Sequence, residues 1–385
     1  MKLQRCCGLD PGSGPAVEVT FEETILSRGN VSGEHGGEAS GLYLAPGFID
    51  LQVNGFAGAD FNRPDLPAEE FGRALNAVLS TGVTRLLPTV ITASPDHMRA
   101  ALHNLARARA ASPLGRAVAG FHVEGPHISP DDGPRGAHPR AWVRAPSIDE
   151  LAGWMDASEG LLRLVTLAPE YPEAPRYIEA MVARGVVAAI GHTAATGAQI
   201  ADAVSAGASL STHLGNGSHA VLRRHPNYLW EQLADDRLMA SFIADGVHLD
   251  AAFLKTAFRA KGAARTVLVT DASSPAGAMP GSYTLGEQTV QLTAGGRVLL
   301  AGTERLAGSG LSMNRAVANL VRLAGATLAE AVLAASVNPA RAAGIAGRAE
   351  GLAPGERADF VLFRFDPPEE GVQVVETWLD GERVS

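Results

Sequence analysis

Two histidines, one glutamate and one aspartate have the residue types and the positions expected of a hydrolytic metal site. Glu124, His192, His213 and Asp271 each lie at the end of a short apolar segment rich in β-forming residues. One carboxylate and two imidazoles are ligands that zinc prefers, with a coordination position left open for water. We therefore interpret Glu124, His192 and His213 as ligands of one divalent metal ion, with zinc as the first choice and iron, manganese or cobalt as alternatives.

The reaction that such a set supports is hydrolysis of an amide. A divalent ion activates water near neutral pH. Asp271 is interpreted as the acid/base that takes a proton from this water and later delivers it to the leaving amine. His138, in the loop after Glu124, is the candidate for stabilising the oxyanion.

Two neutral amides, Gln52 and Asn54, occupy a segment where two-metal barrel hydrolases often carry His-X-His. An amide oxygen is a poorer zinc ligand than an imidazole, so the pattern favours one tightly held metal. Gln52 and Asn54 could mark a second-metal or water position, and Gln52 could instead hold an acidic neighbour.

Single residues of these types are more often structural than catalytic. A lone histidine at the end of a strand is usually a hydrogen-bonded structural residue, and His122, two residues before Glu124, is expected inside the barrel in that role. The chain has three lysines, Lys2, Lys255 and Lys261, and none ends a predicted strand. This argues against a Schiff-base enzyme and against a lysine bridging two metals. It is the combination of two imidazoles and two carboxylates that favours an active site.

The elements that would position these side chains alternate regularly between residues 46 and 275. Short β-rich runs alternate with longer Ala- and Leu-rich segments of helical period. Eight such units over roughly 250 residues predict an α/β fold, a (β/α)8 TIM-type barrel, whose active site lies at the C-terminal ends of the strands. A doubly wound sheet is the alternative, but no Gly-rich phosphate fingerprint follows the first run. The predicted strands are Gly47–Asn54, Thr84–Val90, Ala117–Glu124, Leu162–Leu167, Val186–His192, Ser209–His213, Ala240–Ala244 and Thr266–Asp271.

The two ends of the chain predict a separate module. Short strands with Gly-rich turns in residues 1–45 and further strands in residues 346–385 would pair into one small β-sandwich. Residues 46–345 would form the barrel, with a β excursion at 280–303 after its eighth strand.

The composition and charge of the chain limit the kinds of molecule that it can bind. The chain of 385 residues has 46% hydrophobic residues and a formal net charge of -9, which argues against nucleic-acid binding but allows a small anionic substrate. We find no membrane-spanning run and no signal peptide, so we expect a cytoplasmic location. Cys6 and Cys7 are the only cysteines and offer no disulfide framework.

Several motifs resemble the N-acetylglucosamine-6-phosphate deacetylases of the amidohydrolase superfamily, along nearly the whole chain. The Glu-Gly-Pro, Ala-Asp-Gly-X-His and Leu-Ala-Gly-Ser elements are the most specific of them, whereas the Asn338 and Gly351 motifs are common to many barrel hydrolases. The matching segments are Ala45–Asp50, Phe121–Pro126, Leu167–Glu170, Gly191–Thr193, Thr212–Leu214, Ala244–His248, Leu268–Ala272, Leu306–Ser309, Asn338–Ala342 and Gly351–Gly355.

The resemblance implies a function and further site residues. Glu124, His192 and His213 match the family's metal ligands, Asp271 its acid/base and His138 its carbonyl-orienting histidine. The reaction implied is removal of the acetyl group from N-acetylglucosamine 6-phosphate, in a homodimer that shares phosphate contacts between subunits. Residues implied to bind the sugar phosphate are Ala137, Asn216, Gly217, Arg224, His248, Leu306, Ala307 and Gly308.

Departures from the family pattern lie in the sugar pocket. The family's Asn-Ala-Met run is replaced by Asn216-Gly217-Ser218, and Arg223 offers a second choice beside Arg224. A different amino sugar, such as N-acetylgalactosamine 6-phosphate or an unphosphorylated sugar, therefore stays open as the substrate. Two further hypotheses are a cyclic-amide hydrolase, which would want a lysine in Leu162–Leu167, and a non-catalytic sugar-binding barrel.

Overall fold

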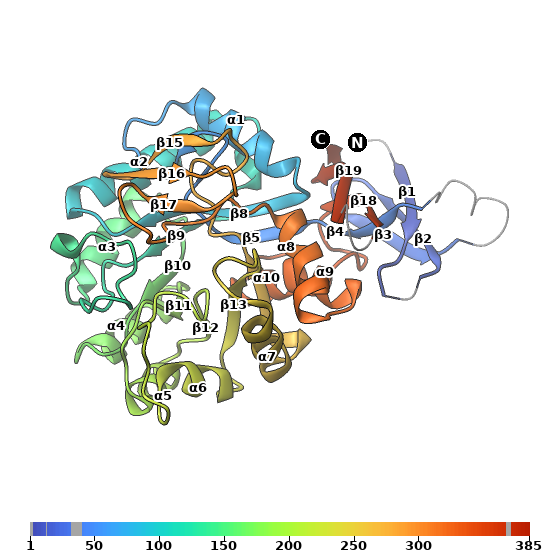
Figure 1. Ribbon diagram of the computed structural model, residues 1–385. Helices are drawn as coiled ribbons and strands as arrows, with labels where there is room; N and C mark the ends of the chain where they lie inside the picture. The colour runs from blue at the N-terminus through green and yellow to red at the C-terminus, as the bar shows by residue number, and fades with distance from the viewer. Residues whose placement is uncertain (1–2, 13, 32–40, 367–370) are drawn as a thin grey trace.

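The structure is a computed structural model that describes residues 3–12, 14–31, 41–366 and 371–385. Parts of both predicted terminal segments, residues 1–2, 13, 32–40 and 367–370, lie outside this description. Figure 1 shows a large barrel with a small sheet beside it, and both chain ends lie in that sheet.

Eight parallel strands form the barrel, as predicted. They follow one another around the sheet in chain order, and a bridge between Val53 and Ala272 joins the first strand to the end of the last. All six residues of the first strand are buried, as expected for strands covered on both faces. The strands are β5 (Phe48–Val53), β8 (Val83–Ile91), β9 (Phe121–Glu124), β10 (Leu162–Leu167), β11 (Val187–Ile190), β12 (Leu210–Ser211), β13 (Met239–Ile243) and β14 (Thr266–Val269).

Helices cover the outside of the barrel, and their ends follow local sequence signals. The Ser94 and Thr196 side chains cap the helices that follow them, and Thr196 forms a capping box with Gln199. Gly82 and Gly185 have φ values of 87° and 74° after their helices, which a residue with a Cβ rarely adopts. The helices are α1 (Ala68–Leu79), α2 (Pro95–Ala111), α3 (Ile148–Ala157), α4 (Ala174–Val182), α5 (Gly197–Ser205), α6 (Tyr228–Ala234), α7 (Ala251–Lys261), α8 (Met313–Asn319), α9 (Leu328–Ala335) and α10 (Val337–Ala342).

Five of the eight strands are shorter than the sequence predicts, the first of them by one residue at each end. The third begins at Phe121 rather than Ala117, because residues 115–117 form a 3-10 turn. The fifth, sixth and eighth end two residues before His192, His213 and Asp271. Those three residues have left-handed backbone conformations that a strand cannot contain.

The small sheet combines strands from both termini. Its seven strands run in the order β20-β19-β18-β4-β1-β2-β3. Phe21 of β2 lies 5.0 Å from Phe360 of β18, measured between ring centroids, although two strands separate them in the sheet. The sheet therefore folds over its own apolar core, so one continuous sheet supplies both layers of the expected sandwich. These strands are β1 (Gln4–Leu9), β2 (Ala16–Phe21), β3 (Ile25–Asn30), β4 (Tyr43–Pro46), β18 (Phe360–Asp366), β19 (Gly371–Leu379) and β20 (Glu382–Arg383).

The predicted excursion after the eighth strand is a three-stranded antiparallel sheet of β15 (Gly281–Leu285), β16 (Gln288–Leu292) and β17 (Val298–Leu300). Its apolar face packs on Ile91, at the end of β8. We propose the predicted boundaries, 1–45, 46–345 and 346–385, as the division of the chain. β4 runs one residue past the first boundary, to Pro46, and pairs with β18.

Candidate active site

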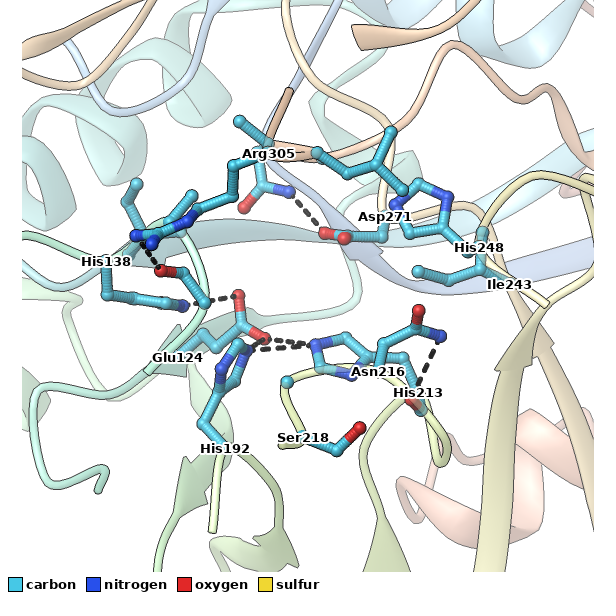
Figure 2. Close-up of a pocket in the computed structure, with 18 of the residues that line it drawn as sticks. Glu124, His138, His192, His213, Asn216, Ser218, Ile243, His248, Asp271 and Arg305 are labelled. Carbon is cyan, nitrogen blue, oxygen red and sulfur yellow. Dashed lines mark hydrogen bonds and ion pairs between the residues drawn. The ribbon is translucent and has the colours of Figure 1, made fainter. Parts of the chain in front are cut away.

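Three ligand atoms from separate strands converge at the mouth of the barrel. Glu124 ends β9, while His192 and His213 follow β11 and β12 by two residues. Glu124 Oε1 lies 3.2 Å from His192 Nε2 and 2.8 Å from His213 Nε2, and the two Nε2 atoms are 3.2 Å apart. All three side chains are buried, and Figure 2 shows them pointing toward one another.

This cluster fits a divalent cation. His192 Nδ1 lies 2.7 Å from the Pro134 carbonyl oxygen, which can only accept a hydrogen bond, so Nδ1 carries the proton and Nε2 keeps its lone pair. His213 Nδ1 is buried with no partner, and its Nε2 faces the same point. Because two imidazole nitrogens and one carboxylate oxygen lie within 4.8 Å of one another, Glu124, His192 and His213 could together hold one ion.

The backbone at the site is unusual. His192, His213 and Asp271 have φ values of 52°, 28° and 49°, a region that non-glycine residues seldom occupy. Each value falls directly after a barrel strand, where the turn redirects the side chain into the mouth. Such conformations cluster at functional sites, where the surrounding structure holds the strain.

Burial and neighbouring charges perturb both carboxylates of the site. Burial and the negative charge of Glu124 raise the pKa of Asp271 to about 6. Burial would raise the pKa of Glu124 as well, but the adjacent imidazoles of His192 and His213 bring it well below its ordinary value. One acid is thus held ionised while the other can exchange a proton near neutral pH, as acid/base catalysis requires.

Gln52 and Asn54 donate hydrogen bonds to these acids. Gln52 Nε2 lies 2.9 Å from Glu124 Oε1 and 3.1 Å from Asp271 Oδ1, and Asn54 Nδ2 lies 2.7 Å from the same Asp271 oxygen. Holding an acidic neighbour was one of the roles expected for Gln52, and this geometry agrees with it. The role of Gln52 and Asn54 in a second-metal or water position stays a prediction.

His138 lies beside the cluster as a neutral imidazole. Its Nδ1 is 2.8 Å from Thr92 Oγ1, and its Nε2 is 3.8 Å from Glu124 Oε2. Burial and the nearby His192 lower the pKa of His138 to about 3. A neutral histidine in this place can donate one hydrogen bond to an oxygen beside the metal site.

His122 and Glu170 form hydrogen bonds with residues next to the site. His122 is fully buried, with Nδ1 at 3.1 Å from the Leu51 carbonyl and Nε2 at 2.8 Å from Thr166 Oγ1, so it has the interior role predicted for it. Glu170 accepts hydrogen bonds from the Thr193 hydroxyl and the Ala194 amide, which hold the loop after His192.

A cavity of about 360 Å³ opens above the three ligands. Most of the residues predicted to bind the sugar phosphate line it together with the catalytic cluster. Arg224 does not: it is exposed in the loop before α6, where the Asn227 side chain bonds to its carbonyl. The predicted binding residues that line the cavity are Ala137, Asn216, Gly217, His248, Leu306, Ala307 and Gly308.

Charged residues at the edge of this cavity were not predicted from the sequence. Arg297 lines it from the three-stranded excursion, and Glu304 and Arg305 line it from the segment just after β17. Arg305 directly precedes the predicted sugar loop at Leu306, which is the one signal that could have pointed to it. Nothing in a β-strand pattern indicates that the excursion folds back over the barrel mouth.

Comparisons with known proteins agree with this geometry. The sequence profile of the amidohydrolase family matches residues 43–384. The N-acetylglucosamine-6-phosphate deacetylase of Bos taurus is 36% identical over 361 residues, 90% of this chain and 84% of that protein. The N-acetylgalactosamine-6-phosphate deacetylase of Escherichia coli O157:H7 is 36% identical over 342 residues, 89% and 88% of the two chains.

A solved structure is similar along its full length. A mutant N-acetyl-D-glucosamine-6-phosphate deacetylase from Mycobacterium smegmatis, in complex with N-acetyl-D-glucosamine-6-phosphate, superposes with a TM-score of 0.89 and 31% identity, covering 100% of both chains. The chain therefore belongs to the amidohydrolase family, in its group of N-acetylglucosamine-6-phosphate deacetylases.

Proposed function

We propose that this protein hydrolyses the N-acetyl group of N-acetylglucosamine 6-phosphate, giving glucosamine 6-phosphate and acetate. The observation that carries the proposal is the convergence of Glu124, His192 and His213 on one point, with Asp271 tied to Glu124 through Gln52. The relatives of known activity supply the substrate class.

We propose zinc as the metal held by Glu124, His192 and His213, because one carboxylate and two imidazoles are ligand types that zinc prefers. When bound, a divalent ion there supplies Lewis acidity and makes water easier to deprotonate. Amidohydrolases are metal-dependent. Metal analysis of the purified protein tests which divalent metal is bound.

The proton transfers fall to Asp271. Its ionised carboxylate accepts a proton from the attacking water, and the resulting acid donates it to the nitrogen that leaves as the amine. Gln52 and Asn54 hold one oxygen of this carboxylate, so the other oxygen is free to face the substrate. His138 donates a hydrogen bond to the carbonyl oxygen as negative charge develops on it.

Sugar binding is assigned to the residues around the cavity. Asn216 and His248 offer polar groups to the sugar, and the Leu306–Gly308 loop forms an opposite wall. His248 Nδ1 lies 2.7 Å from Asp245 Oδ2, which fixes the orientation of the ring. A charged sugar phosphate does not cross a membrane unaided, so we propose the cytoplasm as the location.

We propose that the protein acts as a homodimer in which Arg224 binds the phosphate held by the neighbouring subunit. Arg224 is exposed outside its own cavity, and Val221 and Trp230 near it are 88% and 49% exposed, which is unusual for large apolar side chains. Light scattering of the purified protein tests this arrangement. A monomer at micromolar concentration would contradict it.

The central experiment measures acetate release from N-acetylglucosamine 6-phosphate alongside metal analysis of the same sample. We expect turnover that chelation abolishes and added zinc restores. No turnover by metal-loaded protein would contradict the proposed function and favour a non-catalytic sugar-binding barrel.

A second candidate substrate is N-acetylgalactosamine 6-phosphate, because the Escherichia coli relative with that name is as similar to this chain as the bovine one. Parallel kcat/KM values for the two epimers decide between them. Unphosphorylated N-acetylglucosamine, included in the same series, measures what the phosphate contributes.

Among the residues that the structure describes, none of the helices has the length and apolar character needed to cross a membrane.

A further inference from the structure

The three-stranded excursion forms one wall of the active-site opening. Leu285 of β15 and Arg297, just before β17, line the cavity, and the sheet packs against Ile91 and Ala137 of the barrel. In Figure 1 this sheet lies over the strands of the barrel near β8 and β9. The excursion is therefore placed to contact whatever part of a substrate extends out of the barrel mouth.

Arg305 reaches over this opening without an acidic partner. Its Nη1 donates to the carbonyl oxygen of Gly136 at 3.0 Å, which leaves its other N–H groups available (Figure 2). Neither Arg305 nor Arg297 forms an ion pair with a carboxylate in the described part of the chain. Both side chains are exposed, so neither charge has been removed from solvent.

The other charged groups around the cavity have assigned roles or other interactions. Glu124 and Asp271 are assigned to the metal site and proton transfer, and His138 lies beside Glu124 with its Nδ1 2.8 Å from Thr92 Oγ1. His248 is held by Asp245. Glu304 also lines the opening, but within the described residues it pairs with neither arginine. Arg297 and Arg305 are therefore the positive charges that the chain itself offers to an anion in this cavity.

We infer that Arg305, assisted by Arg297, binds the phosphate of the amino sugar within the same subunit and so selects phosphorylated substrates. The inference rests on the proposed function and assigns a second source of phosphate affinity besides Arg224 of the neighbouring subunit. A guanidinium that keeps one hydrogen bond to a fixed carbonyl is already oriented, so it loses little freedom when it binds a phosphate oxygen.

The test compares Arg305→Gln with Arg305→Lys. Glutamine removes the charge but keeps an N–H donor, whereas lysine keeps the charge. We expect Arg305→Gln to raise KM for N-acetylglucosamine 6-phosphate roughly tenfold with kcat little changed, and Arg305→Lys to recover most of that loss. Turnover of unphosphorylated N-acetylglucosamine should not change in either variant. Arg297→Gln should give a smaller change in the same direction.

Arg259→Gln, on the exposed face of α7, is the charge-matched control and should leave KM unchanged. Equal losses on phosphorylated and unphosphorylated sugars would mean that Arg305 only holds the loop at Gly136, and no change on either would mean that it binds nothing. Both results overturn the inference.

A binding measurement separates this inference from the proposed function. Calorimetry with glucosamine 6-phosphate and with glucosamine needs no turnover. If the parent binds the phosphate more tightly and Arg305→Gln loses that preference, the inference holds even where acetate release fails. If acetate is released but the preference is unchanged in Arg305→Gln, the function stands and the inference is wrong.

Discussion

Buried carboxylates at the two ends of the barrel are stabilised in opposite ways. At the C-terminal ends of the strands, Asp271 and Glu124 accept hydrogen bonds from neutral side-chain amides. Glu124 also contacts two imidazoles, and no arginine or lysine of the described residues pairs with either acid. At the N-terminal ends, Asp359 is bound by two arginines. Arg85 lies 2.7 Å from it and Arg348 lies 2.8 Å from it.

The pKa values follow this difference. Burial raises the pKa of Asp271 to about 6, helped by the charge of Glu124. Burial also disfavours the ionised form of Asp359, but the charges of Arg348 and Arg85 outweigh it and lower its pKa. Equal burial therefore produces a carboxylate that exchanges protons in one place and a permanently charged one in the other.

The ion pairs of Asp359 with Arg85 and Arg348 join the small sheet to the barrel. Asp359 directly precedes β18 of the small sheet, while Arg85 belongs to β8 of the barrel. Arg348 also donates to the Gly47 carbonyl and the Thr84 hydroxyl, at the start of the barrel. Oppositely charged groups are paired at this end, which favours stability, whereas the carboxylates of the proposed active site at the other end have no cationic arginine or lysine partner among the described residues, in line with the general division of roles in barrel enzymes.

The largest effect is expected at the catalytic end. Asp271→Asn removes the proton acceptor but keeps the shape, so we expect turnover to fall about 10²–10⁴-fold while metal content and unfolding free energy stay near the parent values. Steady-state acetate release with metal analysis measures this. Asp202→Asn on the exposed face of α5 is the control, and unchanged turnover in Asp271→Asn would place the acid/base elsewhere.

The opposite result is expected at the other end. Asp359→Asn leaves Arg348 buried without a counter-charge and leaves Arg85 with Asp380 alone, so the free energy of unfolding should fall by about 3–5 kcal/mol. Urea unfolding measures the loss, and kcat of the remaining folded enzyme should be close to normal. Asp236→Asn, an exposed acid, is the control. If Asp359→Asn were as stable as the parent but had poor turnover, the proposed structural role of Asp359 would be wrong.

A third buried carboxylate, Asp50, is expected to make stability depend on pH. Burial raises the pKa of Asp50 to about 7 despite hydrogen bonds from Thr270. A raised pKa means that its contribution to stability is present below the unfolded-state pKa and is lost as pH rises through 7. Asp50→Asn mimics the protonated form, so its stability relative to the parent should increase by about 2 kcal/mol between pH 5 and pH 8.

Urea unfolding at several pH values measures this difference. For Asp359 the sign is reversed, because a lowered pKa gives stability that is present above the unfolded-state pKa and is lost as pH falls through the folded-state pKa. A difference between Asp50→Asn and the parent that does not vary with pH would mean that Asp50 is ionised throughout.

The smallest effect concerns the amide that holds Asp271. Asn54→Ala removes a hydrogen bond of 2.7 Å that lowers the pKa of Asp271. Because a base must be ionised, kcat/KM falls as pH falls through this pKa, and the acid limb of the profile should move to higher pH in the variant. A bound cation lowers the pKa in both proteins, so the profiles are compared at equal metal content. A shift to lower pH would contradict the assignment of Asn54.

Much of the fold followed from sequence pattern. Alternating β-rich and helical segments predicted all eight barrel strands, because fully buried parallel strands are continuously apolar and their helices have apolar faces. The start of the third strand was placed four residues early, and three carboxyl-terminal borders failed before His192, His213 and Asp271, where the backbone turns left-handed. Secondary-structure propensities do not predict these left-handed conformations, because the surrounding tertiary structure imposes them.

The convergence of the proposed site residues could be predicted because a parallel barrel brings the ends of all its strands to one face. Residue type and position at a strand end were enough to choose Glu124, His192, His213 and Asp271. Family motifs added seven of the residues that line the cavity, and they also indicated Arg224, which does not line the cavity of its own chain.

Which residues meet at the site follows from chain order, because the strands of the barrel follow one another in that order. Their pKa values and the positions of their side chains depend on tertiary contacts. The pKa of Asp271 depends on burial and on the distance to Glu124, and the position of Arg305 depends on how the excursion packs on Ile91. Both depend on distances between segments far apart in the chain, which no local pattern of residues specifies.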